Sequence, residues 1–164
     1  MMDMEAALLF DDNVDFECYI VGGGAFILMG YAIRSTHDID ILEVVPKSLK
    51  KLFEKYDVVN DNVIAYSDNF PDGYKERAIR IMDTRKIKYY TLSLEDLVIS
   101  KLCTTRGVQD FDDIENESVY KNIDWNILHK LAISLKSTML SSEAYNNFLY
   151  NYKDYVRRFK SCED

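Results

Sequence analysis

The segment from residue 19 to residue 42 constrains the fold of this chain more than any other, and it reads YIVGGGAFILMGYAIRSTHDIDIL. Its pattern predicts a strand, a turn of three glycines, an apolar helix and a second strand that carries Asp38 and Asp40. Because side chains alternate along a strand, these two carboxylates are expected on the same face of the sheet. Bare backbone N–H groups in a glycine turn that leads into a helix suit phosphate. The segment therefore predicts a place for a nucleoside triphosphate and the divalent metal ion that accompanies it.

Each half of this pattern also has a plainer explanation. Two acids one residue apart occur on surface strands where water alone solvates them, and three glycines occur in tight turns that only glycine fits. As a dinucleotide-binding fingerprint the turn fails, because the third glycine would fall at Ile27, and a P-loop is excluded because no Gly-Lys-Ser/Thr is present. Two carboxylates so close repel each other unless they share a cation or one takes up a proton. The two features together favour Mg²⁺, which takes carboxylate and phosphate oxygens as ligands.

The composition bounds the class of protein. The 164 residues fit one domain, and 48% hydrophobic with 29% charged residues is ordinary for a globular chain. No apolar run approaches the roughly 20 residues of a membrane span, and the acidic first residues lack the basic region of a signal peptide. Three cysteines without a CxxC spacing argue against a disulfide framework or a zinc site. We therefore expect a cytoplasmic protein with no membrane partner.

The charge is unevenly distributed. A net charge of −8 is not typical of a protein that coats nucleic acid without specificity. Residues 75–88 nevertheless carry six basic side chains against two acidic ones. They would form either a basic face near the phosphate site or a solvated surface.

The periodicity predicts an α+β protein. A small mixed sheet with its helices occupies about residues 1–92, and a helical part occupies about residues 93–164 of one domain. Ser93 is expected to cap the first helix of the second part. The expected strands are 18–21, 38–45, 62–67, 78–82 and 87–92, and the expected helices are 25–33, 47–56, 94–103, 108–117, 125–137 and 142–160.

Two motifs resemble those of one protein family. VGGGA at 21–25, followed by G-Y-x-x-R-S-T-x-D-I-D at 30–40, resembles the head motif of the minimal nucleotidyltransferases, which have the polymerase-beta-like fold. LEDLVISKL at 94–102, followed by Arg106, Asp110 and Asp113, resembles the second motif of one branch of that family. This branch contains the AbiEii-like nucleotidyltransferases of abortive-infection and toxin–antitoxin systems. The motifs occur in the expected order and frame residues 20–114, whereas the C-terminal helices add nothing to the resemblance.

The resemblance implies a role for each matching position. Asp38 and Asp40 would hold Mg²⁺ or Mn²⁺, and Lys101 would reach the nucleotide phosphates from the helical side. The nucleotide-binding positions would be Gly22, Gly23, Gly24, Arg34 and Thr36. The remaining motif positions, with a general base or a partner-binding group among them, are Glu95, Arg106, Asp110 and Asp113. For these four, a structural role such as the i,i+4 ion pair of Arg106 with Asp110 is the alternative.

The chain departs from the family pattern at two places. Many relatives have serine or threonine where this chain has Gly24, so a hydroxyl that would contact phosphate is missing. The wider fold also often supplies a third carboxylate from a neighbouring strand. Here Asp83 is the only acid close to the end of an expected strand.

The sequence therefore predicts a magnesium-dependent nucleotidyltransferase with an NTP as substrate, with a toxin-like enzyme among the candidates. The acceptor would be an RNA such as tRNA, a protein or a small alcohol, and a cognate antitoxin would be a further partner. The alternative is a non-catalytic module that keeps the fold to bind a nucleotide or a protein.

Overall fold

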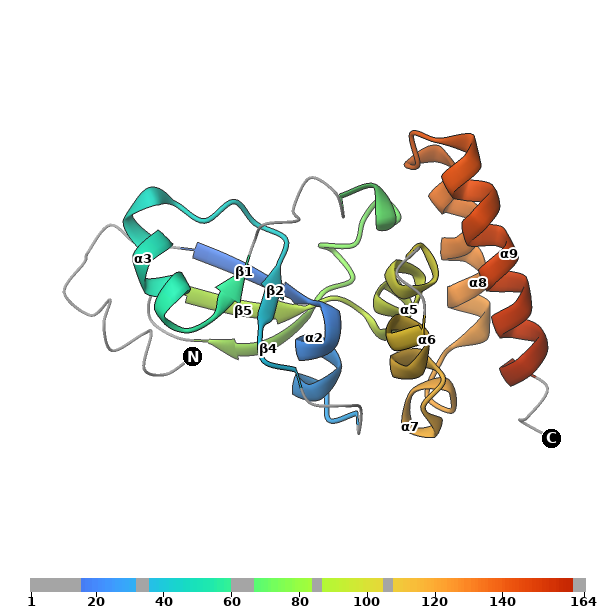
Figure 1. The fold of residues 1–164 in the computed structure, drawn as a ribbon, viewed down its shortest axis with the longest axis horizontal. Coiled ribbons are helices and arrows are strands. Elements are labelled where there is room, and N and C mark those ends of the chain that lie inside the picture. The colour runs from blue at the N-terminus through green and yellow to red at the C-terminus, as the bar shows by residue number, and fades with distance from the viewer. Residues whose placement is uncertain (1–15, 32–35, 60–66, 84–86, 105–107, 161–164) are drawn as a thin grey trace.

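A computed structural model of the chain describes residues 16–31, 36–59, 67–83, 87–104 and 108–160. These residues contain a five-stranded mixed sheet in the order β3-β2-β1-β5-β4, followed by helices, which confirms the α+β class. The strands are β1 (Phe16–Val21), β2 (Ile39–Ile41), β3 (Val58–Val59), β4 (Ile79–Asp83) and β5 (Ile87–Thr91). Figure 1 shows the sheet at one end of the molecule and the later helices gathered at the other.

Strand β1 lies at the centre of the sheet. It pairs antiparallel with β2, where Val21 faces Asp40, and parallel with β5, where Ile20 faces Thr91. Strand β3 adds parallel to β2, and β4 adds antiparallel to β5. The C-terminal end of β1 is therefore the place where the chain leaves the sheet next to Asp40.

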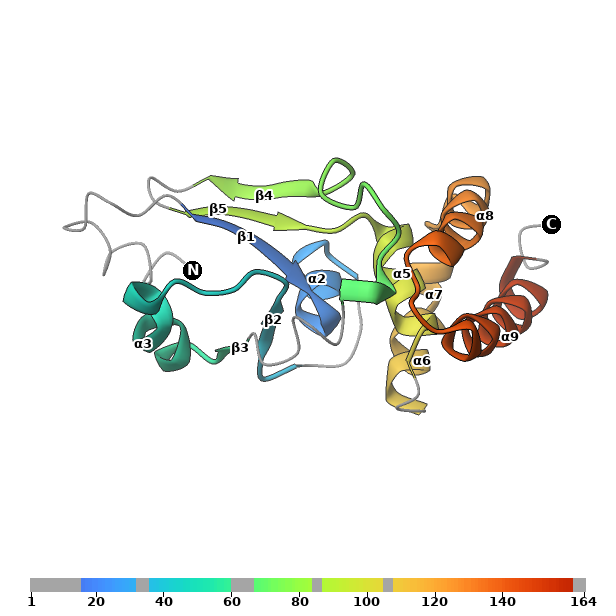
Figure 2. The ribbon, with the colours of Figure 1, turned by 90° about the horizontal axis from the view of Figure 1, so that it is seen from above.

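Two helices cover one face of this sheet. They are α2 (Gly22–Leu28) and α3 (Lys47–Lys55), and in Figure 2 both lie on the same side of β1, β5 and β4. Phe16 of β1 meets Phe53 of α3 edge to face, with 5.7 Å between ring centroids. The aliphatic and aromatic side chains of this face are buried, so α2 is held close to both β1 and β2.

The second half is built around α5 (Leu94–Leu102). Ser93 caps this helix as expected, because its Oγ accepts a hydrogen bond from Asp96 N at 3.1 Å. Nearly all of α5 is buried, and it contacts α2 as well as three helices of its own half. The elements that follow α5 are α6 (Val108–Ile114), α7 (Glu117–Tyr120), α8 (Trp125–Ser134), the short 3₁₀ helix η2 (Leu135–Ser137) and α9 (Ser142–Phe159). Among the described residues, no helix is long and apolar enough to cross a membrane.

Several boundaries differ from the expectation. The three glycines are not a loop before the helix but its first turn, because a positive φ of 64° at Gly22 already bends the chain into α2. The helix then ends at Leu28 and not at residue 33, and the long helix expected over 108–117 is divided into α6 and α7. The side chain of Asn116 starts α7 by accepting from Ser118 N, which explains this division. Most of the expected strand 62–67 lies outside the described residues, whereas β3 lies at 58–59, and a 3₁₀ helix η1 (Ser67–Asn69) follows.

Candidate functional site

The glycine turn and the acid pair lie against each other. A Cβ atom built on Gly22 would stand only 2.5 Å from Asp40 Oδ2, which is closer than side-chain atoms approach in real proteins. Gly22 also has φ +64°, a conformation that other residues adopt at a cost. Only glycine therefore lets the main chain pass so close to the carboxylate of Asp40.

Gly24 is a different case. A Cβ atom there would lie 3.8 Å from the Asp38 carbonyl oxygen and 3.9 Å from Ile20 Cγ2, which are ordinary contact distances. Its neighbour Gly23 is buried in the same turn. Space alone thus does not demand glycine at position 24, although the turn passes beside the backbone of the acid pair there too.

The two acids differ in exposure. Asp38 lies just before β2 and is exposed, whereas Asp40 lies within β2 and is partly exposed. Thr36 Oγ1 donates a hydrogen bond to the Asp38 carbonyl oxygen at 3.3 Å, so Thr36 braces the backbone that carries the pair. Arg34, which was predicted to act with Thr36, lies outside the described residues.

The chemistry of this donor set suits a hard cation. Two carboxylates next to a main chain without a Cβ atom match the one or two protein ligands that Mg²⁺ takes beside phosphates and water. Among the described residues, however, no three His, Cys, Asp or Glu side chains come together as a metal cluster. The residues fit an ion that is completed by a substrate, and they do not form a closed metal cage.

Asp83 lies far from this pair. It is paired with Lys88, which lies beside Glu17 at the start of β1, whereas Asp40 lies beside Val21 at the end of β1. These two rows are four positions apart along β1, which is about 13 Å at 3.3 Å per residue. The one acid that the sequence offered as a third carboxylate therefore belongs to the opposite end of the sheet.

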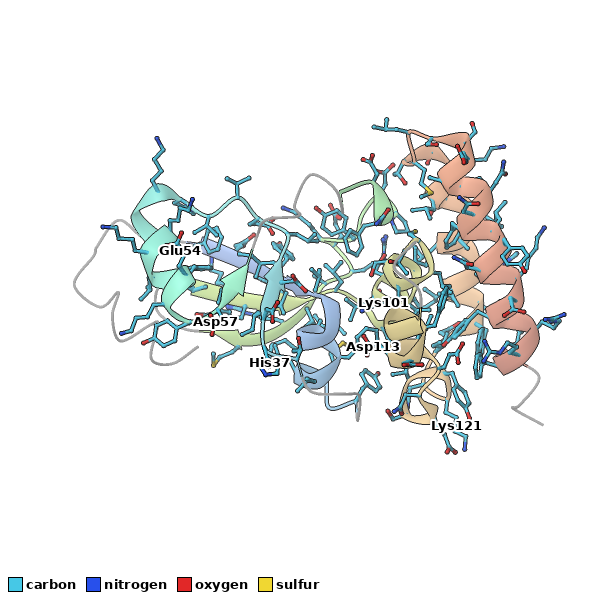
Figure 3. All side chains as sticks on the ribbon, viewed as in Figure 1. His37, Glu54, Asp57, Lys101, Asp113 and Lys121 are labelled. Atoms are coloured by element: carbon cyan, nitrogen blue, oxygen red, sulfur yellow. The ribbon has the colours of Figure 1, made fainter. Side chains whose placement is uncertain are left out.

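The helical motif brings together Lys101 and Asp113. Lys101 Nζ lies 2.8 Å from Asp113 Oδ2, and the two side chains are only 9% and 1% exposed. Figure 3 labels both where α5 and α6 meet. The ammonium that was predicted to reach phosphates is thus engaged with a buried carboxylate. Arg106 and the side chain of Asp110 lie outside the described residues.

Glu95 connects two helices. Its Oε1 accepts a hydrogen bond at 2.9 Å from the backbone N–H of Asp124, which is the N-cap residue of α8. Burial raises the pKa of the Tyr31 hydroxyl, and the nearby Glu95 carboxylate raises it further. Glu95 therefore holds the start of α8 against α5.

A salt bridge that the sequence did not reveal joins Arg77 to Asp96. Arg77 Nε donates to Asp96 Oδ2 at 2.9 Å, and Nη2 donates to Oδ1 at 2.8 Å, while Asp96 is fully buried. Lys75 is also engaged, with Nζ 2.6 Å from Glu43 Oε1. Two members of the basic segment 75–88 thus neutralise acids of the fold. The expected cap at Ser93 was the only sequence signal for a structural role of Asp96, and no sequence pattern indicated Arg77 as its partner.

One family model matches this chain over residues 1–160, and the family is described as "Nucleotidyltransferase of unknown function (DUF6036)". The comparisons with curated proteins and with solved structures found no match.

Proposed function

Because the chain belongs to this family of nucleotidyltransferases of unknown function, we propose that it moves a nucleoside monophosphate from an NTP onto a hydroxyl acceptor. A bond forms between the acceptor oxygen and the α-phosphorus, and the bond from this phosphorus to the pyrophosphate oxygen breaks. Pyrophosphate leaves with the electron pair of the broken bond, and the hydroxyl loses its proton. Positioning and charge neutralisation accelerate such a transfer without a covalent intermediate on the protein.

The contact between Gly22 and Asp40 is the observation that carries this proposal. A tight turn needs glycine for its φ angle, but it has no need of a carboxylate directly against the glycine. A site for a metal-bound triphosphate needs both a close main chain and an acid pair. Asp38 and Asp40 would hold Mg²⁺ or Mn²⁺ there, and the bound ion would neutralise charge on the triphosphate and on the departing pyrophosphate.

The remaining residues of the site support this arrangement in different ways. Gly23 and Gly24 would bring backbone N–H groups close to the phosphates, and Thr36 would keep the Asp38 backbone in place. The exposed Asp38 carboxylate is better placed to accept the hydroxyl proton than Asp113, which is buried in its pair with Lys101. Lys101 would meet phosphate only after exchanging its partner.

The acceptor is an RNA such as tRNA, a protein side chain or a small alcohol. The AbiEii-like resemblance favours a toxin-like enzyme with a cognate antitoxin as a further partner. Both motifs that carry this resemblance lie within the matched residues.

A non-catalytic module is the second candidate, and one observation favours it. The described residues supply two carboxylates at the glycine turn and no third, so a second metal ion would be held weakly. Such a module would bind a nucleotide or a protein partner through the same fold and would not depend on Asp38 or Asp40 for chemistry.

Label transfer from each α-labelled NTP, with Mg²⁺, onto total tRNA and total cell protein tests the proposal. Wild type should label one acceptor, and Asp38→Asn with Asp40→Asn should lower the transfer at least a thousandfold while the protein stays folded. The matched control is Glu54→Gln with Glu143→Gln, which removes two exposed carboxylates elsewhere and should leave transfer unchanged. Full transfer by the folded Asp38/Asp40 variant would overturn the mechanism. Absence of both label and NTP binding in wild type would favour the non-catalytic module.

A further inference from the structure

A groove of about 390 Å³ lies between α8 and α9. Figure 1 shows these two helices side by side at the end of the molecule, with α5 and α6 between them and α2. The groove is therefore separate from the glycine turn and the acid pair. Its lining combines the aromatic side chains of Trp125, His129 and Tyr152 with two basic side chains of α9 and that of its C-cap residue, Lys160.

The aromatic side of the groove is already ordered. His129 Nδ1 lies 3.0 Å from the Tyr152 hydroxyl, and the two rings are stacked with 6.3 Å between centroids and 25° between planes. Trp125 forms part of the lining and is 7% exposed. His129 is exposed, so a planar ring of a ligand could stack on it and extend the existing pair of rings. Tyr152 is already ordered against His129, so this stacking would cost no further side-chain entropy there.

The basic side is a row along one helix. Lys153, Arg157 and the C-cap residue Lys160 follow one another at spacings of four and three, which places them along one face of α9 and its C-terminal end over about 10 Å at 1.5 Å per residue. Arg157 Nη2 lies 2.6 Å from Asp154 Oδ1, whereas Lys153 and Lys160 form no ion pair with any residue that the structure describes. No carboxylate is among the described side chains that line the groove. A cationic row on a chain of net charge −8 attracts an anion locally, although the chain as a whole repels one.

We propose that this groove binds a short segment of single-stranded RNA, with bases against the aromatic side and phosphates along the row of α9. The row is longer than one phosphate group, which favours successive phosphates over a free mononucleotide. Planar rings in the lining favour bases over the aliphatic anchors of an acidic peptide. The claim that this RNA is also the acceptor rests on the proposed function, and it narrows the acceptor to one class.

The chain's one tryptophan reports on the groove directly, since Trp125 lines it. Quenching of its fluorescence by a mixed-sequence 12-nucleotide RNA is measured without NTP and without Mg²⁺, so that binding is separated from transfer. Lys153→Glu with Lys160→Glu should weaken binding at least tenfold. Lys47→Glu with Lys51→Glu, on exposed positions of α3, makes the same change in net charge and should keep nearly the wild-type affinity. In wild type, log K should fall with log salt by about 0.7 for each neutralised phosphate, and this slope should flatten in the groove variant.

Several results would overturn the inference. One is the absence of RNA binding by wild type at low salt, and another is an equal loss in both lysine variants. AMP that binds as tightly as the RNA would make the ligand a free nucleotide, and poly-glutamate that displaces the RNA at equal charge would make it an acidic peptide. If the RNA binds in the groove as expected but receives no label from the NTP, the groove would still be an RNA-binding site. That result would refute only the claim that this RNA is the acceptor.

Discussion

In the sheet half of the molecule, Asp38 is exposed and Asp40 is partly exposed, and the main chain of α2 passes directly beside them. In the helical half, Lys101 and Asp113 are enclosed together between α5 and α6. The sheet half therefore holds two carboxylates at the surface, beside main chain that carries no side chain. The second half pairs opposite charges away from water.

This difference determines what a mutation means. Removing an exposed acid changes ligand binding with little effect on folding, because water solvates whatever remains. Removing one member of a buried pair leaves an uncompensated charge in the interior and lowers the free energy of unfolding before any chemistry is affected. Loss of activity is therefore informative about mechanism in the sheet half, whereas in the helical half it must first be separated from loss of the fold.

Asp113→Ala is expected to produce the largest change in stability. It should lower the free energy of unfolding by about 3–5 kcal/mol, because the Lys101 ammonium stays buried and loses the Asp113 carboxylate. Urea denaturation measures the change. The matched control is Glu54→Ala, which breaks the Lys50–Glu54 pair at 4.0 Å, where the side chains are 70% and 62% exposed. That variant should stay within about 0.5 kcal/mol of wild type, and an equally small effect of Asp113→Ala would remove the contrast between the halves.

A double variant sharpens the same contrast. Lys101→Met with Asp113→Leu replaces both charges by apolar groups of similar size and should recover most of the lost stability. If this folded protein still transfers label, the pair is structural only. If it is stable and inactive, at least one member of the pair also acts in the transfer reaction.

Gly22→Ala should have an intermediate effect. The positive φ angle and the approach to Asp40 Oδ2 together should cost about 1–3 kcal/mol of unfolding free energy, and Asp40 should be displaced. Gly30→Ala is the control, because Gly30 has φ +87° but no atom within 4 Å of an added Cβ, so that only backbone strain is introduced. Adding Asp40→Ala should reduce the cost of Gly22→Ala. Equal urea midpoints for the two glycine variants would show that Asp40 does not constrain Gly22.

Gly24→Ser should have the smallest effect on stability. The added Cβ atom meets only ordinary contacts, and the change should stay within about 0.5 kcal/mol in a helix position where serine is preferred to glycine. If a hydroxyl here contacts phosphate, as the family resemblance implies, NTP should bind several-fold more tightly in a titration calorimeter. Gly24→Ala fills the same space without a hydroxyl, and an equal gain from it would refute that explanation.

The sequence predicted those parts of the fold that depend on residues close together in the chain. The strand that ends at Val21, the Ser93 cap of α5 and the helix that begins near Trp125 all follow from residues close to each other in the sequence. The motifs also predicted a nucleotidyltransferase, which the family model confirms over residues 1–160, whereas the AbiEii-like branch stays a prediction. The metal, the acceptor and the roles of the site residues stay predictions.

The sequence could not predict the pairings between distant segments. Nothing in the pattern shows that Arg77 reaches Asp96 or that Glu95 accepts a hydrogen bond from Asp124 N, because these contacts depend on how the halves pack. Strand β3 was missed because two residues are too short to show an alternation.

The pairing of β1 with β5 has a consequence for how the protein is made. Phe16 of β1 is paired with Ile87 of β5. The central strand can therefore form hydrogen bonds along both of its edges only after most of the sheet half has left the ribosome. Until then a nascent chain that already carries Asp38 and Asp40 exposes an open strand edge, the kind of surface that recruits other unfinished chains. The candidate site is thus assembled late during synthesis, and a product that stops before residue 87 would contain both acids without the strand that completes their scaffold.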